Sequence, residues 1–186
     1  ELAWKLTKEN VRAAVPWGAV AASVTMNASG TPLHERELKR TKGQAFCFLP
    51  LPVNPQVPVH VNGYFELSSN RRDIWHGTDM QGSGALRALW NHTLLRQVLA
   101  PLYANLVEYM CPSLGDAAAA LLWPQRMPLQ PWQILVEGFY EEIASRKVLY
   151  SKVKERLWLT PEQPVEISFF SVWCFYGRLR LVCFAY

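Results

Sequence analysis

Charged residues are scarce in this sequence. They make up 18% of its 186 residues, whereas 50% of the residues are hydrophobic, including eight tryptophans. Disordered chains combine low hydrophobicity with high charge, so this composition excludes a disordered chain and predicts one that folds around a core. The length suits one full-sized core, or one core together with part of a second domain.

A long apolar run is also missing. No window of about 18 consecutive uncharged apolar residues occurs, so we expect no membrane-spanning helix and no membrane partner. The N-terminal segment is charged and amphipathic, and it lacks the apolar stretch of a signal peptide. It begins without an initiator Met, which we interpret as a sign that the chain is a piece of a longer protein. We expect a cytoplasmic location.

Motifs for metal binding and catalysis are absent as well. The four cysteines form no C-x-x-C pair and have no histidine at zinc-ligand spacing, so we interpret them as reduced core cysteines of an intracellular protein. They are Cys47, Cys111, Cys174 and Cys183. The Gly-x-Gly at 82–84 is typical of a loop before a helix, and a Cys47–His60 nucleophile pair lacks an orienting acid. We expect no metal site and no enzyme within this chain.

The positive net charge is small. Nineteen basic and 15 acidic residues give +4. The densest basic segment, 34–42, contains Glu35 and Glu37 and has no interleaved aromatic residues, which is typical of a solvated connection rather than a nucleic-acid surface. We therefore expect no nucleic-acid partner.

One long helix dominates the hydrophobic pattern. Between residues 85 and 110 apolar side chains recur every four residues, which predicts a core-facing helix. Pro101 lies inside this pattern and predicts either a kink or the start of a second helix, and Pro112 and Gly115 predict its end. Within it, Trp90-Asn91 is interpreted as a core tryptophan beside a polar residue that bonds a loop.

The remaining pattern predicts an α+β fold. We expect a mixed sheet built from strands at 45–52 and 59–67 with at least one neighbour, covered on one face by the 85–110 helix and a 131–145 helix. The 59–67 strand carries a bend or bulge at Asn62-Gly63. Further helices are expected at 1–13 and 117–123, and further strands at 15–26, 148–151, 156–160 and 164–170.

Three blocks of the sequence resemble sacsin-type repeats. They are GQAFCFLPLP with PVHVNGYFELSSNRRDIW (43–52 and 58–75), WNHTLLRQVLAPLYANLVEYM (90–110) and LLWPQRMPLQPWQILVEGFYEEIASRKVLYS (121–151). Their order and spacing are similar to those of that family, downstream of its ATPase-like region. The resemblance implies that 1–44 ends the preceding ATPase-like region, that 45–170 is the sacsin-repeat α/β domain, and that 171–186 is an atypical tail.

The resemblance also implies a relation to the ninety-kilodalton heat-shock chaperones, in which an ATPase domain is followed by an α/β middle domain. The fold expected for this chain resembles that middle domain. The function implied is that of a non-catalytic chaperone or scaffold module, which contacts neighbouring domains of the same chain and protein clients or co-chaperones. ATP and magnesium would belong to the parent protein, because the acidic-Asn, Asp-x-Gly-x-Gly and lid motifs of the ATPase are absent here.

The loop that follows the 59–67 strand is the candidate site. In the chaperones that the chain resembles, a loop at this place bears a basic residue that faces the ATP site of the preceding domain. The resemblance therefore implies, as an alternative function, nucleotide sensing through an Arg supplied in cis to an upstream ATPase. The candidate residues are Ser68, Ser69, Asn70, Arg71 and Arg72.

The chemistry of these residues leaves two interpretations open. The guanidinium groups of Arg71 and Arg72 suit phosphate oxygens or carboxylates, and the short polar side chains before them can bond the backbone. Either arginine could face a nucleotide. Alternatively, it could pair with Asp73 or Glu66 and pin the loop.

Overall fold

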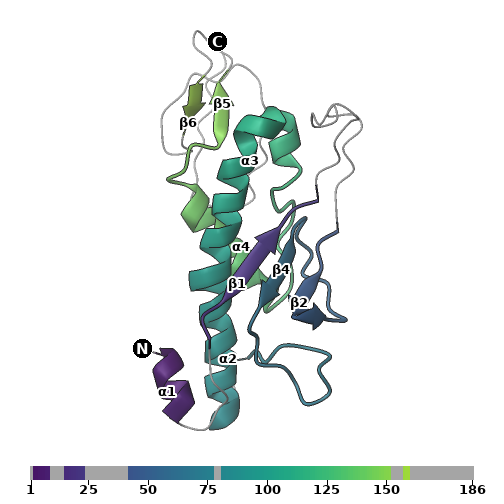
Figure 1. Cartoon of the computed structure of the whole chain (residues 1–186), viewed down its shortest axis with the longest axis vertical. Coiled ribbons are helices and arrows are strands. Elements are labelled where there is room, and N and C mark those ends of the chain that lie inside the picture. The colour runs from purple at the N-terminus through teal and green to yellow at the C-terminus, as the bar shows by residue number, and fades with distance from the viewer. Residues whose placement is uncertain (1, 9–14, 24–41, 78–80, 152–156, 160–186) are drawn as a thin grey trace.

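A long helical rod lies beside a small sheet in this protein. The computed structural model describes residues 2–8, 15–23, 42–77, 81–151 and 157–159 (Figure 1). The rod runs along the longest axis of the molecule, and the sheet packs against its side. The expected strand at 164–170 and the tail at 171–186 lie outside the described residues, as does most of the basic segment 34–42.

The sheet is mixed, as the sequence predicted. Its strands are β1 (Gly18–Ala21), β2 (Ala45–Cys47), β3 (Leu49–Pro50) and β4 (His60–Gly63), in the spatial order β1-β4-β2-β3. β4 is antiparallel to β1 and parallel to β2, and β2 is antiparallel to β3. β1 is thus the neighbour that the two predicted strands required. It comes from the segment 1–44, whose division from the rest of the chain stays a prediction.

The segment 45–52 is a sharp hairpin rather than one strand. Cys47 pairs with Leu49, and the residue between them, Phe48, has a left-handed φ of 60°. The single strand expected here was wrong, because the apolar run gives no sign that the chain reverses inside it. The backbone N–H of Leu51 closes the hairpin by donating to the carbonyl of Ala45 at 2.9 Å.

β4 confirms the second predicted strand, although it is shorter than expected. Its inner positions Val61 and Gly63 are buried, whereas His60 and Asn62 point to the outer face. The ladder ends at Gly63, where a Cβ would lie 3.0 Å from the ring of Phe65. The missing side chain lets that ring fold back closely, so the chain leaves the sheet at the predicted bend.

The rod is one continuous run of helix. It consists of α2 (Ser83–Thr93), a π-helical segment η1 (Leu94–Leu99) and α3 (Ala100–Ala120). The helix predicted at 85–110 is confirmed, but no second helix begins at Pro101. A proline ring crowds the carbonyl of the preceding turn, and the wider π-helical turn just before it gives that ring room.

The predicted helix end at Pro112 and Gly115 was also wrong. Both residues lie inside α3, which continues to Ala120 and includes most of the segment expected as a separate helix at 117–123. Four consecutive alanines, 117–120, explain the extension, because alanine has the highest helix propensity and offsets part of the cost of the proline.

The shorter elements agree with the sequence. α4 (Trp132–Ile143) is the helix predicted at 131–145, and α1 (Leu2–Lys8) confirms part of the helix predicted at 1–13. β5 (Leu149–Ser151) and β6 (Leu157–Leu159) form an antiparallel pair at the far end of the rod from α1 (Figure 1).

The core lies where the inner face of the sheet and α4 meet the rod. Two glycines allow the closest approaches: a Cβ on Gly18 would lie 2.7 Å from Leu99, and one on Gly138 would lie 2.8 Å from Ala100. The rings of Tyr103 and Phe139, 4.3 Å apart between centroids, join α3 to α4. The expected α+β architecture, a mixed sheet backed by long helices, is therefore confirmed.

Candidate functional site

The candidate loop is a tight turn that projects from the end of β4. Its two sides meet in a bridge between Leu67 and Ile74, above which the N–H of Ser68 donates to the carbonyl of Asp73 at 2.8 Å. The N–H of Arg71 donates to the carbonyl of Ser68 at 2.8 Å. Arg71 has a φ of 55°, an uncommon value for a residue with a side chain. The turn is thus closed by its own backbone.

Two of the predicted polar residues bond the backbone inside the turn, as their chemistry suggested. The Asn70 Oδ1 accepts the N–H of Arg72 at 3.0 Å, and the Ser68 hydroxyl accepts the N–H of Asp73 at 3.2 Å. The Ser68 hydroxyl also lies 2.7 Å from the Asn70 Oδ1. Ser69 is exposed. Ser68 and Asn70 therefore shape the turn, and neither is directed at a distant ligand.

The base of the loop is fastened to α2. Asn91 is only 1% exposed, and its amide bonds both the N–H and the carbonyl of Glu66 and the carbonyl of Trp75. The indole N–H of Trp90 donates to the carbonyl of Tyr64 at 2.9 Å. The prediction of a core tryptophan beside a loop-bonding asparagine is confirmed, and both sides of the loop are fixed to one helix.

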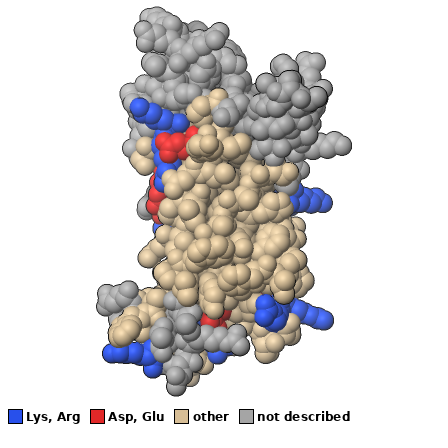
Figure 2. Space-filling view, viewed as in Figure 1, with Lys and Arg blue, Asp and Glu red and all other residues tan. Residues whose placement is uncertain are grey.

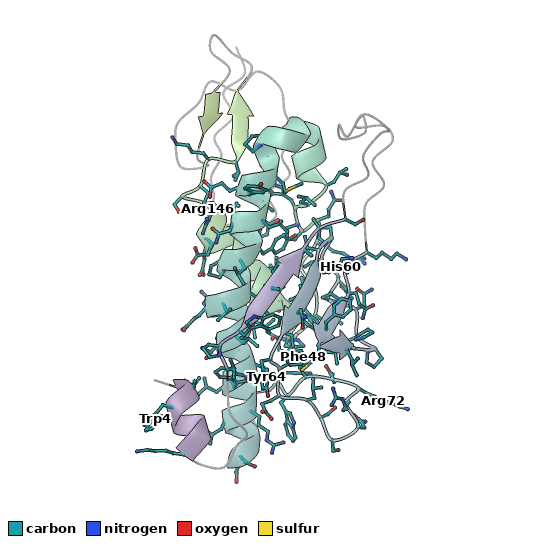
Figure 3. All side chains as sticks on the ribbon, in the orientation of Figure 1. Trp4, Phe48, His60, Tyr64, Arg72 and Arg146 are labelled. Carbon is teal, nitrogen blue, oxygen red and sulfur yellow. The ribbon has the colours of Figure 1, made fainter. Side chains whose placement is uncertain are left out.

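The two arginines are exposed at the tip of this turn (Figure 3 labels Arg72). Neither guanidinium group pairs with the acids that the sequence offered. Glu66 lies 3.8 Å from the Nε of Arg87, and Asp73 lies 3.6 Å from the imidazole of His76. The interpretation in which an arginine pins the loop through Asp73 or Glu66 was wrong, because those carboxylates face other partners and hydrogen bonds already hold the turn.

A cysteine nucleophile is not assembled near the loop. The Cys47 thiol is on the inner face of the sheet and donates to the carbonyl of Phe65 at 3.6 Å, whereas His60 is on the outer face. Burial raises the pKa of the Cys47 thiol, and the charge of Arg71 opposes that rise without cancelling it. The cysteine is therefore a protonated core residue, as is Cys111, which is also buried and free.

The described residues offer neither a metal cluster nor a membrane-spanning helix. Over the described ranges, no group of three or more His, Cys, Asp or Glu residues is placed to hold a metal ion. In the same part of the chain, no helix combines the length and apolar character needed to cross a membrane. The chemistry that the loop itself offers is recognition of an anion, through two exposed guanidinium groups on a well-held turn.

Comparison with known proteins identifies the family. Human sacsin is 32% identical to the chain over an alignment of 139 residues, and the alignment covers 72% of the chain. The chain is a sacsin-like protein. The matched region is 3% of the length of sacsin, so the sacsin-like chain corresponds to a small part of that protein. No protein-family model and no solved structure matches the sacsin-like chain.

The match confirms the resemblance to sacsin-type repeats that the three sequence blocks predicted. The relation to heat-shock chaperones stays a prediction. Sequence reasoning about the sacsin-like chain missed one group of residues on the outer face of the sheet, the exposed rings of Trp17 and Phe48 and the half-buried ring of Tyr64. These rings come from three separate segments, and no periodic signal in the sequence connects them.

Proposed function

We propose that the sacsin-like chain is a non-catalytic chaperone or scaffold module of a longer cytoplasmic protein. It makes contacts with neighbouring domains of the same chain and with protein clients or co-chaperones. The observation that supports this proposal best is the loop after β4. That turn presents Arg71 and Arg72 to the exterior, and its own hydrogen bonds and Asn91 hold it without help from either side chain. A charge presented on a fixed support suits recognition of an acidic surface on another domain or protein.

The topology supports a relation to the middle domain of the ninety-kilodalton heat-shock chaperones. β4 leads into an exposed basic loop, and a long helix follows it, in the order that the sequence resemblance implied. This is an analogy between topologies, and it carries less weight than the identity with sacsin.

The alternative function uses the same loop in a different way. In a parent protein with an upstream ATPase domain, Arg71 or Arg72 would face the γ-phosphate and stabilise the charge that develops on it during hydrolysis. ATP and magnesium would then bind to the upstream domain. The exposure of both guanidinium groups supports this alternative, since a buried or paired arginine could not reach another domain.

Two substitutions in the longer parent separate these functions. Arg71→Ala and Arg72→Ala leave ATP turnover and nucleotide-dependent closure unchanged if the module is a scaffold. At least one of them abolishes turnover if it senses nucleotide. Arg126→Ala removes an exposed arginine far from the loop in sequence and serves as the matched control.

The scaffold function has a direct assay of its own. The 186-residue chain is mixed with thermally unfolding luciferase, and light scattering reports aggregation. We expect the chain to suppress scattering and the double variant Arg71→Glu/Arg72→Glu to lose most of that effect, whereas Lys147→Glu, another exposed charge reversal, retains it. Equal suppression by both variants would count against a role for the loop in partner contacts.

A further inference from the structure

The outer face of the sheet carries a cluster of aromatic side chains, of which Trp17 and Phe48 are exposed and Tyr64 is half-buried. The rings of Trp17 and Phe48 stack with centroids 5.9 Å apart and planes inclined by 5°. Tyr64 meets Phe48 edge to face, with centroids 5.5 Å apart (Figure 3). Phe48 is 63% exposed and the adjacent Leu49 is 65% exposed. We call Trp17, Phe48, Leu49 and Tyr64 the aromatic face.

The backbone holds the central ring outward. Phe48 is the residue at which the β2–β3 hairpin reverses, and its φ of 60° is a conformation that favours glycine. Its N–H donates to the side chain of Asn62 on β4 at 3.3 Å. A phenylalanine at this position strains the backbone and leaves its own ring in water, so folding alone does not explain why it is there. The stacked neighbours fix the ring in one place, which lowers the entropy cost of binding to it.

Few charged side chains lie around the aromatic face. The outward positions of the neighbouring strands are Ala19, Ala21, His60 and Asn62. Most of these side chains are small, so the aromatic rings project beyond them. Figure 2 shows a broad expanse of uncharged residues on this side of the molecule, with a small acidic patch at its lower edge. A flat apolar area of this kind is typical of a surface that another molecule covers.

The charges at the two margins of this expanse differ. Lys and Arg stand at its right-hand margin in Figure 2, where Figure 1 places β2 and the loop after β4. Lys42, which precedes β2, and Arg71 and Arg72, at the tip of the loop after β4, are exposed basic residues of these segments. Acidic and basic side chains lie together at the left-hand margin, where Figure 3 labels Arg146, which forms ion pairs with Glu108 and Glu142. The margin next to the aromatic face therefore has unpaired positive charge, whereas the left-hand margin is largely neutralised.

We propose that the aromatic face, with Arg71 and Arg72 at its rim, binds an extended peptide segment of a partner protein that combines large apolar side chains with carboxylates. This inference rests on the proposed scaffold function and names the chemistry of its partner. The rings would receive the apolar side chains, and the guanidinium groups would pair with the carboxylates. A single-stranded nucleic acid suits the surface less well, because such ligands need positive charge along the whole groove, and here it is confined to the rim.

Selection from a random peptide library tests the proposal. Twelve-residue peptides displayed on phage are selected on the 186-residue chain, and the enriched sequences are synthesised with a fluorescent label for anisotropy titration. We expect enrichment of Phe, Leu, Ile or Pro together with Asp and Glu. We also expect the affinity of these peptides to fall with rising salt, because the rim contacts are exposed ion pairs.

The decisive variant is Phe48→Gly. Glycine fits the left-handed φ at this position, so the variant keeps the hairpin while it removes the ring. We expect it to weaken peptide binding about 10-fold or more, as removal of a central aromatic anchor does. Arg71→Ala/Arg72→Ala should weaken binding several-fold, mainly at low salt. Tyr109→Ala, which removes a ring that is 79% exposed on α3, should leave binding unchanged.

Three results would overturn the proposal. These are equal affinity of the wild-type chain and Phe48→Gly for the selected peptides, a selected set without acidic residues, and tighter binding of single-stranded oligo-dT than of any selected peptide. The scaffold function fails separately, if the chain does not suppress luciferase aggregation or if the arginine variants abolish ATP turnover in the parent. If Phe48→Gly loses peptide binding, the aromatic face is a peptide-binding site whether or not the scaffold function fails.

Discussion

The side chain of Asn91 bonds both backbone polar groups of Glu66. Its Oδ1 accepts the N–H of Glu66 at 2.9 Å, and its Nδ2 donates to the carbonyl of Glu66 at 2.8 Å and to that of Trp75 at 2.9 Å. The N–H of Trp75 donates to the carbonyl of Glu66 at 3.0 Å, and the buried amide of Asn91 bonds the other two backbone groups of this pair. The position of the arginine loop relative to the rod depends on this residue.

Replacing Asn91 should destabilise the protein and loosen the loop. Asn91→Leu leaves the N–H of Glu66 and the carbonyl of Trp75 without this partner, whereas the carbonyl of Glu66 keeps the N–H of Trp75 at 3.0 Å. Each orphaned group costs about 1–3 kcal/mol, so we expect a loss of about 2 kcal/mol or more in the free energy of unfolding. Urea denaturation followed by tryptophan fluorescence measures it. Gln97→Leu, an exposed change in the same rod, should shift stability by less than about 0.5 kcal/mol. Equal effects of the two changes would show that the hydrogen bonds of Asn91 contribute little.

The contact between α4 and the rod predicts a compensating pair of substitutions. A Cβ on Gly138 would lie 2.8 Å from the Cβ of Ala100, so Gly138→Ala should destabilise the protein by about 1–3 kcal/mol through overpacking, despite the better helix propensity of alanine. Ala100→Gly removes the obstructing methyl group. In a double-mutant cycle, the double variant should therefore be more stable than the sum of the single effects predicts. Strict additivity would mean that the helices separate freely at this point.

Periodicity predicted the elements that packing dominates, and it failed where single residues decide the backbone. The apolar stripe of the rod located that helix, because burial of one face requires it. The reversal at Phe48 was not predicted. Hydrophobic periodicity does not indicate a left-handed residue inside an apolar run, and phenylalanine seldom adopts that conformation. Pro112 predicts a helix end by itself, but α3 continues past it into four alanines at 117–120, whose helix propensity offsets part of the cost of one proline.

For the candidate site, the sequence predicted the residues but only part of their arrangement. The residue types in the loop indicated which side chains bond the backbone, and Ser68 and Asn70 do so. The residue types alone do not predict which acidic side chain pairs with which arginine. Glu66 faces Arg87, because both lie at the base of the loop, whereas Arg71 and Arg72 point out at its tip. That choice follows from tertiary structure.

The buried thiol of Cys111 predicts a loss of stability at alkaline pH. Burial raises its pKa from 9.0 to about 12, and the nearby carboxylate of Glu108 adds to the rise. The folded state therefore holds this proton more tightly than the unfolded state does. The resulting contribution to stability is complete below pH 9 and is lost as the pH rises towards 12, with a slope of at most about 1.4 kcal/mol per pH unit.

Substitution of the cysteine isolates this contribution from that of other groups. Cys111→Val keeps an apolar side chain in the core, so its free energy of unfolding should fall less steeply than that of the wild type between pH 9 and 11. The difference between the two denaturation series is the quantity to compare. Parallel curves would show that the thiol ionises as readily in the folded protein as in the unfolded chain.

The left-handed backbone of Arg71 predicts that removing its side chain does not harm the fold. With a φ of 55°, an L-residue is strained by roughly 1 kcal/mol, and glycine relieves this strain but adds entropy to the unfolded chain. We expect Arg71→Gly to change the free energy of unfolding by no more than about 0.5 kcal/mol. Arg71→Val should destabilise the protein by about 1 kcal/mol or more, because β-branched residues tolerate positive φ worst. Urea denaturation of the three proteins makes the comparison. If Arg71→Gly were as damaging as Arg71→Val, the guanidinium group would have a structural partner, and its availability to another protein or domain would be refuted.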